Sequence, residues 1–114
     1  MKVHIQHQGQ IFVRDVALAD TFWLRLSGYM FRPTPHVNGL LFEPASAMQT
    51  TFMFFSLDMV FLAEDNRVVK VLRSVKPWRH TWFYSKTRKV LEVPAGVIPA
   101  SLKEGDVLTI SPAN

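Results

Sequence analysis

The 114-residue sequence contains no cysteine, and this absence excludes several kinds of site. Disulfide bonds, thiolate nucleophiles and cysteine-ligated metals all require a residue that the chain lacks. The histidines do not replace it. His4 and His7 stand three apart in an alternating segment, so they face opposite sides of a strand, while His36 and His80 are far apart in the sequence. We expect no metal and no cofactor.

Long apolar runs are also missing. The longest candidate, TTFMFFSLDMVFLAE, is interrupted by Ser56 and Asp58 and is shorter than the about 18 residues that a membrane helix needs. The first ten residues, MKVHIQHQGQ, alternate apolar and polar positions, unlike a signal peptide. The length is that of one domain. We therefore expect a single domain over residues 1–114, cytoplasmic and without a membrane span, whose oligomeric state the sequence does not indicate.

Local catalytic motifs are absent as well. The chain has no GxSxG nucleophile elbow, no HExxH metal motif, no phosphate-binding GxxxxGK[ST] and no dinucleotide-binding GxGxxG. The sequence thus does not favour an enzyme.

The apolar residues that are present follow a strand pattern over most of the chain. Short strands are predicted around residues 3–5, 11–13, 40–43, 50–55, 57–62, 67–75, 89–93 and 107–110, separated by Gly, Pro, Asn and Asp. The period changes over Asp15–Gly28, which predicts a helix of about three turns, and Ile98–Leu102 predicts a short helical turn near residue 100. The expected fold is mainly β (α+β), mostly antiparallel and barrel-like, because closure removes exposed strand edges.

Six sequence pieces occur in a recognisable order between about residue 16 and residue 110. They are ADTFWLRLSGYMFRP, NGLLFEP, TTFMFFSLDMVFLAEDNRVVKV, KPWR, VLEVPAG and EGDVLTI. Together they resemble the domain of unknown function 192, a widespread bacterial and archaeal family. The resemblance implies a small, compact, β-rich domain. It implies no mechanism, because no activity is established for the family.

The resemblance also places the family's polar positions on this chain, at Arg25, Asp58, Glu92 and Asp106. The sequence departs from the family pattern at three places: Gln49 stands where relatives typically have His, Phe54 where they often have Lys or Arg, and Ser56 where they usually have Pro. The loss of the histidine argues further against acid-base chemistry.

Asp58 stands inside the apolar run FFSLDMVFL, where an unpaired charge would be costly. Its structural role would be to accept backbone N–H groups where one strand bends into the next, or to pair with Arg25. The alternative is a polar pocket formed by Arg25, Gln49 and Asp58, with Phe52 and Trp78 nearby. Such a pocket would belong to a small-ligand-binding protein or an enzyme.

Basic charge is concentrated in one segment, since residues 67–90 contain eight Lys and Arg and no Asp or Glu. We expect a packed hairpin here, with about half of its aromatic side chains facing inward and a basic outer face. The candidate binding face consists of Arg73, Lys76, Trp78, Arg79, Trp82, Lys86, Arg88 and Lys89. The leading hypothesis is a non-catalytic binding module for an acidic protein or another polyanion. Binding of single-stranded nucleic acid is a second alternative, because such sites combine cations with aromatic rings.

Overall fold

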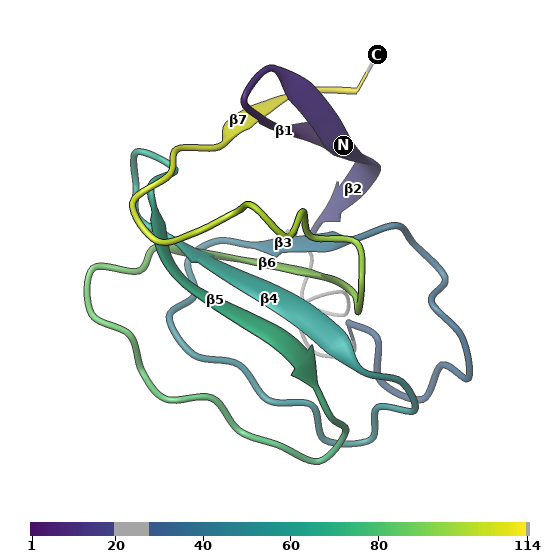
Figure 1. The fold of residues 1–114 in the computed structure, drawn as a ribbon. Helices are drawn as coiled ribbons and strands as arrows, with labels where there is room; N and C mark the ends of the chain where they lie inside the picture. The colour runs from purple at the N-terminus through teal and green to yellow at the C-terminus, as the bar shows by residue number, and fades with distance from the viewer. Residues whose placement is uncertain (20–27, 114) are drawn as a thin grey trace.

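The computed structural model describes residues 1–19 and 28–113 of the chain (Figure 1). Its strands are β1 (Lys2–His7), β2 (Gln10–Leu18), β3 (Leu40–Phe42), β4 (Leu57–Leu62), β5 (Val68–Val75), β6 (Lys89–Pro94) and β7 (Thr109–Pro112). Gln8 and Gly9 connect β1 to β2, and both have positive φ, of 53° and 79°. Two successive positive φ angles match the right-handed twist of a hairpin, so the predicted first hairpin is confirmed.

The strands form one open sheet in the order β5-β4-β6-β3-β2-β1-β7. All neighbours are antiparallel except β2 and β3, which are parallel. The mainly-β, mostly antiparallel prediction is therefore confirmed. The expected barrel closure is not found, because β5 and β7 remain the two edges of the sheet. An isolated bridge joins Arg67, just before β5, to Val107, just before β7, but the two strands themselves are not paired.

None of the described residues forms a helix, so the helical turn predicted at Ile98–Leu102 is not found, and none of these residues forms a helix that could cross a membrane. The prediction for Asp15–Gly28 is wrong in its first part, since residues 15–18 continue β2, while residues 20–27 lie outside the described residues. Near residue 100 there is a single turn, in which the Leu102 N–H donates to the Pro99 carbonyl at 3.1 Å. The Arg73 guanidinium donates to the carbonyls of Ile98, Pro99 and Leu102, so they bond to a side chain and not to a further helical turn.

Two more local predictions are wrong. Residues 50–55 form turns where a strand was expected, and Phe52 has a φ of 62°, which a strand does not allow. Residues 76–88 are not a hairpin but irregular chain with one isolated bridge, between His80 and Gln49. The sequence of both segments is rich in strand-forming residues, but the backbone of each bends to cover the sheet.

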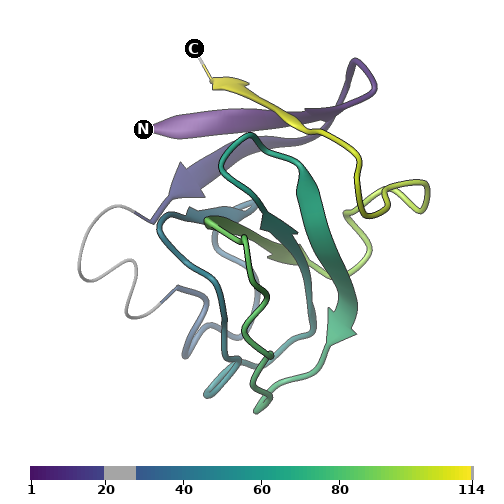
Figure 2. The same ribbon diagram turned by 90° about the vertical axis from the view of Figure 1, so that its left-hand side faces the viewer.

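The central strands are buried on both faces of the sheet. Every residue of β4 is buried, with Val60 and Leu62 in one hydrophobic cluster and Leu57, Met59 and Phe61 in the other. The hairpin of β1 and β2, together with β7, covers the first face (Figure 2). The second face is covered by irregular segments around residues 29–37, 45–55 and 84. Half of the core is therefore closed by loops.

Asp58 stabilises the ends of two strands. Its side chain is 2% exposed. Oδ1 accepts the backbone N–H of Ser74 at 2.8 Å, and Oδ2 accepts that of Gly96 at 2.9 Å. Ser74 has a φ of 54°, and the register of β4 and β5 shifts between Leu57 and Met59. The Asp58 carboxylate thus accepts the Ser74 N–H, which the bulge removes from the hydrogen bonds between β4 and β5.

We predict that Asp58→Ala lowers the free energy of unfolding by about 3 kcal/mol, because the N–H groups of Ser74 and Gly96 lose their acceptor at roughly 1–3 kcal/mol each. Urea denaturation followed by tryptophan fluorescence measures the change. The matched control is Glu104→Ala, which removes an exposed acid and should change stability by less than about 0.5 kcal/mol. Equal, small changes in both variants would contradict this role of Asp58.

Candidate functional site

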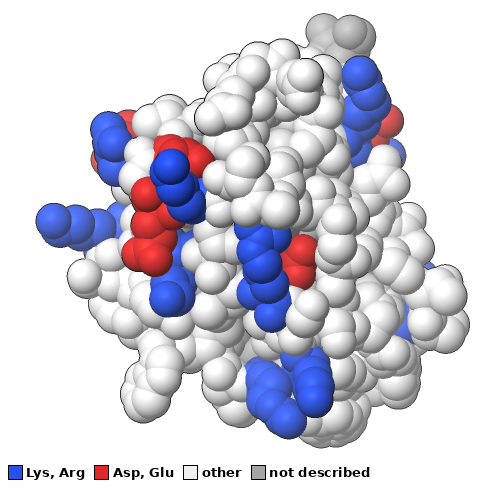
Figure 3. Space-filling model, in the orientation of Figure 1, with Lys and Arg blue, Asp and Glu red and all other residues white. Residues whose placement is uncertain are grey.

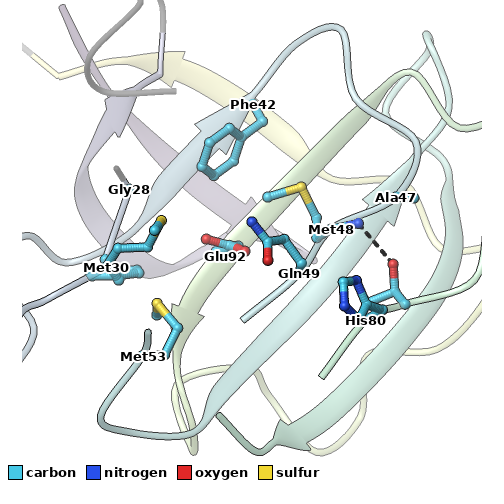
Figure 4. Close-up of a pocket in the computed structure, with 11 residues that line it drawn as sticks. Gly28, Met30, Phe42, Ala47, Met48, Gln49, Met53, His80 and Glu92 are labelled. Carbon is cyan, nitrogen blue, oxygen red and sulfur yellow. Dashed lines mark hydrogen bonds between the residues drawn. The ribbon is translucent and has the colours of Figure 1, made fainter. Parts of the chain in front are cut away.

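A cavity of about 340 Å³ opens on the loop-covered face of the sheet (Figure 4). Its size lies within the range of small-ligand sites. Buried side chains form its base and partly exposed ones form its mouth. The described residues that line it are Gly28, Tyr29, Met30, Phe42, Ala47, Met48, Gln49, Met53, His80, Thr81 and Glu92.

Glu92 is the acidic residue among the described residues that line the cavity, and strand alternation places it there. In β6, Val90 faces the loop-covered cluster, whereas Leu91 and Val93 face the other cluster. Glu92 is two residues beyond Val90 and points to the same side. Its register partners on the two neighbouring strands are Leu40 and Met59, which are both apolar. The carboxyl group therefore has no polar neighbour within its own layer of the sheet.

Burial changes the acidity of this group. Glu92 is 3% exposed, and burial raises its pKa from 4.5 to about 8. Among the described residues, none donates a hydrogen bond to its carboxyl and none forms an ion pair with it. Glu92 is therefore a neutral carboxylic acid at neutral pH, with one O–H donor and free acceptor capacity.

Two titratable residues among the described lining share the cavity with Glu92. The Tyr29 hydroxyl donates to the Val37 carbonyl at 3.0 Å, and burial, followed by the charge of Glu92, raises the pKa of Tyr29. His80 lies at the mouth, opposite Gln49 in the isolated bridge. The base of the cavity is thus acidic and the mouth carries an imidazole and an amide.

Methionine makes up much of the cavity wall. All four internal methionines, Met30, Met48, Met53 and Met59, belong to the loop-covered cluster, and the other cluster contains none. Met30, Met48 and Met53 line the cavity, and Figure 4 shows them around the carboxyl of Glu92. Thioether side chains are flexible and polarisable, so this wall can adapt to the shape of a ligand.

Thr50 holds the two loops that form the mouth. It is fully buried, and its backbone bonds to Trp78 and Arg79 at 2.9 and 2.8 Å. Its hydroxyl donates to the Lys76 carbonyl at 2.7 Å and accepts the Arg79 N–H at 2.8 Å. Further along, the Thr81 N–H donates to the Met48 carbonyl. The segments 46–52 and 78–84 therefore run side by side, as Figure 2 shows.

Aromatic side chains lie outside the cavity on the same loops. The rings of Phe31 and Phe52 stack with centroids 4.8 Å apart, and Phe52 contacts Trp78 edge to face at 4.7 Å. All three are exposed, as are Trp82 (82%) and Phe83 (69%). Of the four aromatic residues between 78 and 84, only Tyr84 packs inward, against Phe61. We call Phe31, Phe52, Trp78, Trp82 and Phe83 the aromatic surface.

The backbone under this surface is strained. Phe31, Phe52 and Trp78 have φ angles of 61°, 62° and 63°. A bulky residue in this left-handed region costs about 1–2 kcal/mol. Phe52 contacts both of the other rings, so these three strained positions lie together on the surface.

The residues of the predicted polar pocket are only partly brought together. Gln49 lines the cavity. Asp58 shares a sheet face with Val60 and Leu62, which is the face opposite to Glu92, and it bonds to backbone. Arg25 lies outside the described residues, so the three-residue set stays a prediction. Sequence reasoning did not assign Glu92 to the pocket. A signal was present, because Glu92 interrupts the apolar run VLEVP in the same way that Asp58 interrupts the apolar run FFSLDMVFL.

The family's remaining polar position, Asp106, lies elsewhere and holds a turn. Its carboxylate is 2.9 Å from His7 Nε2 and accepts the backbone N–H of Lys103. These contacts lower the pKa of Asp106, the Lys103 bond most. Among the described residues, no three His, Asp or Glu side chains are grouped as a metal would require.

The basic residues of the predicted binding face have different roles. Arg73 bonds to the carbonyls near residue 100, Lys89 to Glu64 O and Asn66 Oδ1, and Arg88 pairs with Glu43 at 3.6 Å. Lys76 and Lys86 are exposed, and Arg79 folds back on the carbonyls of Pro77 and Trp78. In Figure 3, Lys and Arg side chains lie below the end of β5 with no Asp or Glu beside them.

We predict that stability depends on pH through Glu92. The folded protein keeps the proton up to a pKa of about 8, whereas the unfolded chain loses it near 4.5. Between these values the folded state binds more protons, so the free energy of unfolding falls as pH rises, by up to about 1.4 kcal/mol per pH unit. Above about pH 8 this contribution is lost.

Glu92→Gln removes the titrating group at nearly constant shape and is the matched variant. Urea denaturation of both proteins at about pH 5, 6.5 and 8.5 should show the variant gaining stability over the native chain as pH rises. A stability difference that is the same at all three pH values would contradict the shifted pKa.

Comparison with known proteins identifies the family. The model of the DUF192 family, described as uncharacterized ACR, matches residues 3–110. The chain is 34% identical over 98 residues to a UPF0127 protein of Thermococcus sibiricus, covering 80% of this chain but only 62% of that protein. It is 33% identical over 99 residues to a UPF0127 protein of Pyrococcus furiosus, covering 82% and 84%.

Solved structures share the fold. A protein of unknown function from Novosphingobium aromaticivorans superimposes with a TM-score of 0.77 at 24% identity, covering 96% of this chain and 84% of that one. A Sinorhizobium meliloti protein gives 0.72 at 24%, covering 96% and 92%. The family match and the UPF0127 relatives show that the chain belongs to the DUF192 family of uncharacterized proteins.

Proposed function

We propose that this protein is a binding module whose aromatic surface, with the exposed cations Lys76, Arg79 and Lys86, binds an acidic segment of a partner protein. The observation that carries the proposal is the exposed contact of Phe31, Phe52 and Trp78 on three strained loop positions. The cavity is not required for this function.

The strain supports a functional role for the surface. Strained backbone persists only where the surroundings hold it, and it concentrates at binding and catalytic sites. Here the bonds of Thr50 hold Trp78 and Arg79, and the Phe31 N–H donates to the Phe52 carbonyl at 3.0 Å. Folding alone gives no reason to keep large rings in left-handed positions facing water. A partner that buries them supplies one.

The composition of the surface fits a protein partner. Tryptophan, phenylalanine and arginine are enriched in protein interfaces, and tryptophan is frequent among residues that dominate binding energy. Among the described residues, Lys76 and Lys86 have no acidic partner within ion-pair distance. Charge complementarity therefore favours an acidic segment and would accelerate association at low salt.

Single-stranded nucleic acid is the second candidate, and one observation favours it. Trp82 and Phe83 are consecutive, and both are exposed. They are therefore available for base stacking, which inward-facing rings would not be. The stacked pair of Phe31 and Phe52 is less suited, because each ring already covers one face of the other.

We predict that poly-glutamate, used as a model acidic polypeptide, binds at low salt and quenches or shifts tryptophan fluorescence in a titration. Rising salt should weaken this binding. Trp82→Ala should reduce the affinity by about tenfold or more, as expected if the partner buries this exposed ring. Lys76→Glu should weaken binding and its salt dependence. The control Lys2→Glu changes an exposed cation on β1 and should have little effect.

Oligothymidylate and heparin complete the experiment. Oligothymidylate binding that is tenfold tighter than that of poly-glutamate and lost in Trp82→Ala would replace the protein partner by single-stranded nucleic acid. If Trp82→Ala binds all the polyanions as tightly as the native chain does, binding depends on the charge of the surface and not on its aromatic rings. No binding of any probe at low salt would contradict the proposal.

A further inference from the structure

The cavity beneath the aromatic surface has features that binding at the outer surface does not use. Glu92 lies at its base, almost fully buried and directed into open space (Figure 4). Buried polar groups normally have hydrogen-bond partners within the protein. Among the described residues Glu92 has none. An unpaired carboxyl that faces a cavity indicates a ligand that completes its bonding.

The surroundings of Glu92 decide which charge the ligand should carry. On β3 and β4 its neighbours are Leu40 and Met59. The other titratable residues that line the cavity are Tyr29, whose hydroxyl bonds to Val37, and His80 at the mouth. No Lys or Arg is among the described lining residues. A cationic ligand would form the ion pair that the described residues do not supply, whereas an anion would be repelled by the ionised acid.

The walls suit the apolar body of such a ligand. Met30, Met48 and Met53 present polarisable thioethers, and Phe42 presents an aromatic ring. The aromatic ring can contact an ammonium group by a cation–π interaction, and the flexible thioethers can pack around an alkyl body. Gln49, at the mouth, adds an amide oxygen that can accept from an N–H group. The volume of about 340 Å³ holds a small organic molecule.

We propose that this cavity binds a small organic cation, an amine or guanidinium with an apolar body, whose charged group lies against the Glu92 carboxyl. Binding then ionises Glu92 and releases its proton to solvent. The exposed cations of the outer surface do not line the cavity. The proposal does not depend on the partner-binding function of the aromatic surface, and either can fail alone.

The test uses three probes with the same six-carbon body: hexylamine, hexan-1-ol and hexanoate. Methyl groups of 13C-labelled methionine report binding by NMR, since Met30, Met48 and Met53 line the cavity, whereas Met1 is exposed at the N-terminus and is the internal control. We expect hexylamine to shift the three cavity methyl signals saturably and hexan-1-ol to bind at least about tenfold more weakly. Hexanoate should bind weakest.

The pH dependence identifies Glu92 as the group that binds the cation. Because the carboxyl must lose its proton, the affinity for hexylamine should rise by up to about tenfold per pH unit between about pH 6 and 8 and then level off. The affinity for hexan-1-ol should not rise. Glu92→Gln should remove both the pH dependence and the preference for the amine. The comparison of the three probes in the native chain remains valid even if this variant is unstable.

Several outcomes would overturn the proposal. Equal affinities for hexylamine and hexan-1-ol at every pH would show that the cavity binds apolar molecules without a preference for positive charge. Tightest binding of hexanoate would indicate that neutral Glu92 donates to an anion. Shifts of the methionine signals with Ag(I) but not with hexylamine would indicate a soft metal site formed by the thioethers. No shift with any probe at millimolar concentration would exclude a ligand site of this kind.

Discussion

The burial of the central strands on both faces is the constraint on which the rest of the structure depends. A sheet with one solvent-exposed face needs to be covered on the other face only. Here β4 is buried at every position, and β6 at all but its ends. The second face therefore has to be covered, and no described helix is available to cover it. The chain uses irregular segments from three places in the sequence, and irregular segments cannot pack as regularly as a helix or a second sheet. The cavity lies where these loops meet over β6. Its position thus follows from the same constraint that closes the core.

The loops would not hold this arrangement without internal polar contacts, because buried backbone groups outside regular structure must find other partners. Thr50 provides them, with its backbone and hydroxyl bonding to the 76–79 segment. Asp58 has a corresponding role close by, where it accepts the N–H groups of Ser74 near the end of β5 and of Gly96 after β6. These two buried residues are polar for structural reasons. Glu92 differs from both, because its burial is not compensated by hydrogen bonds from the described residues, and this difference is the basis for the proposed ligand.

Much of the sheet could be predicted from sequence, because strand alternation is a local signal. β4 was predicted at its observed bounds and β5 and β6 within one residue. The prediction failed where tertiary contacts override local preference. The apolar run of residues 50–55 has strand propensity, but Phe52 turns outward into a left-handed conformation while Met53 turns inward. Trp82 and Phe83 were expected to alternate between core and solvent, yet both are exposed, because the segment is not a strand. For the site, Gln49 was found from the family pattern, whereas the approach of Glu92 to Met30, Met48 and His80 depends on loop packing that has no local sequence signal.

The cavity and the aromatic surface are joined by the chain itself. Met30 lines the cavity and Phe31, the next residue, belongs to the outer surface; Met53 and Phe52 repeat this relation on a second loop. Any ligand that displaces Met30 or Met53 acts on the backbone that presents the two stacked phenylalanines. That backbone is already strained at both phenylalanines, so small changes in φ there alter its free energy more than they would in a relaxed loop. The proposed ligand site in the cavity and the proposed binding surface outside it therefore share two short segments of chain. Coupling between them needs no path through the sheet, because adjacent residues of one loop carry it.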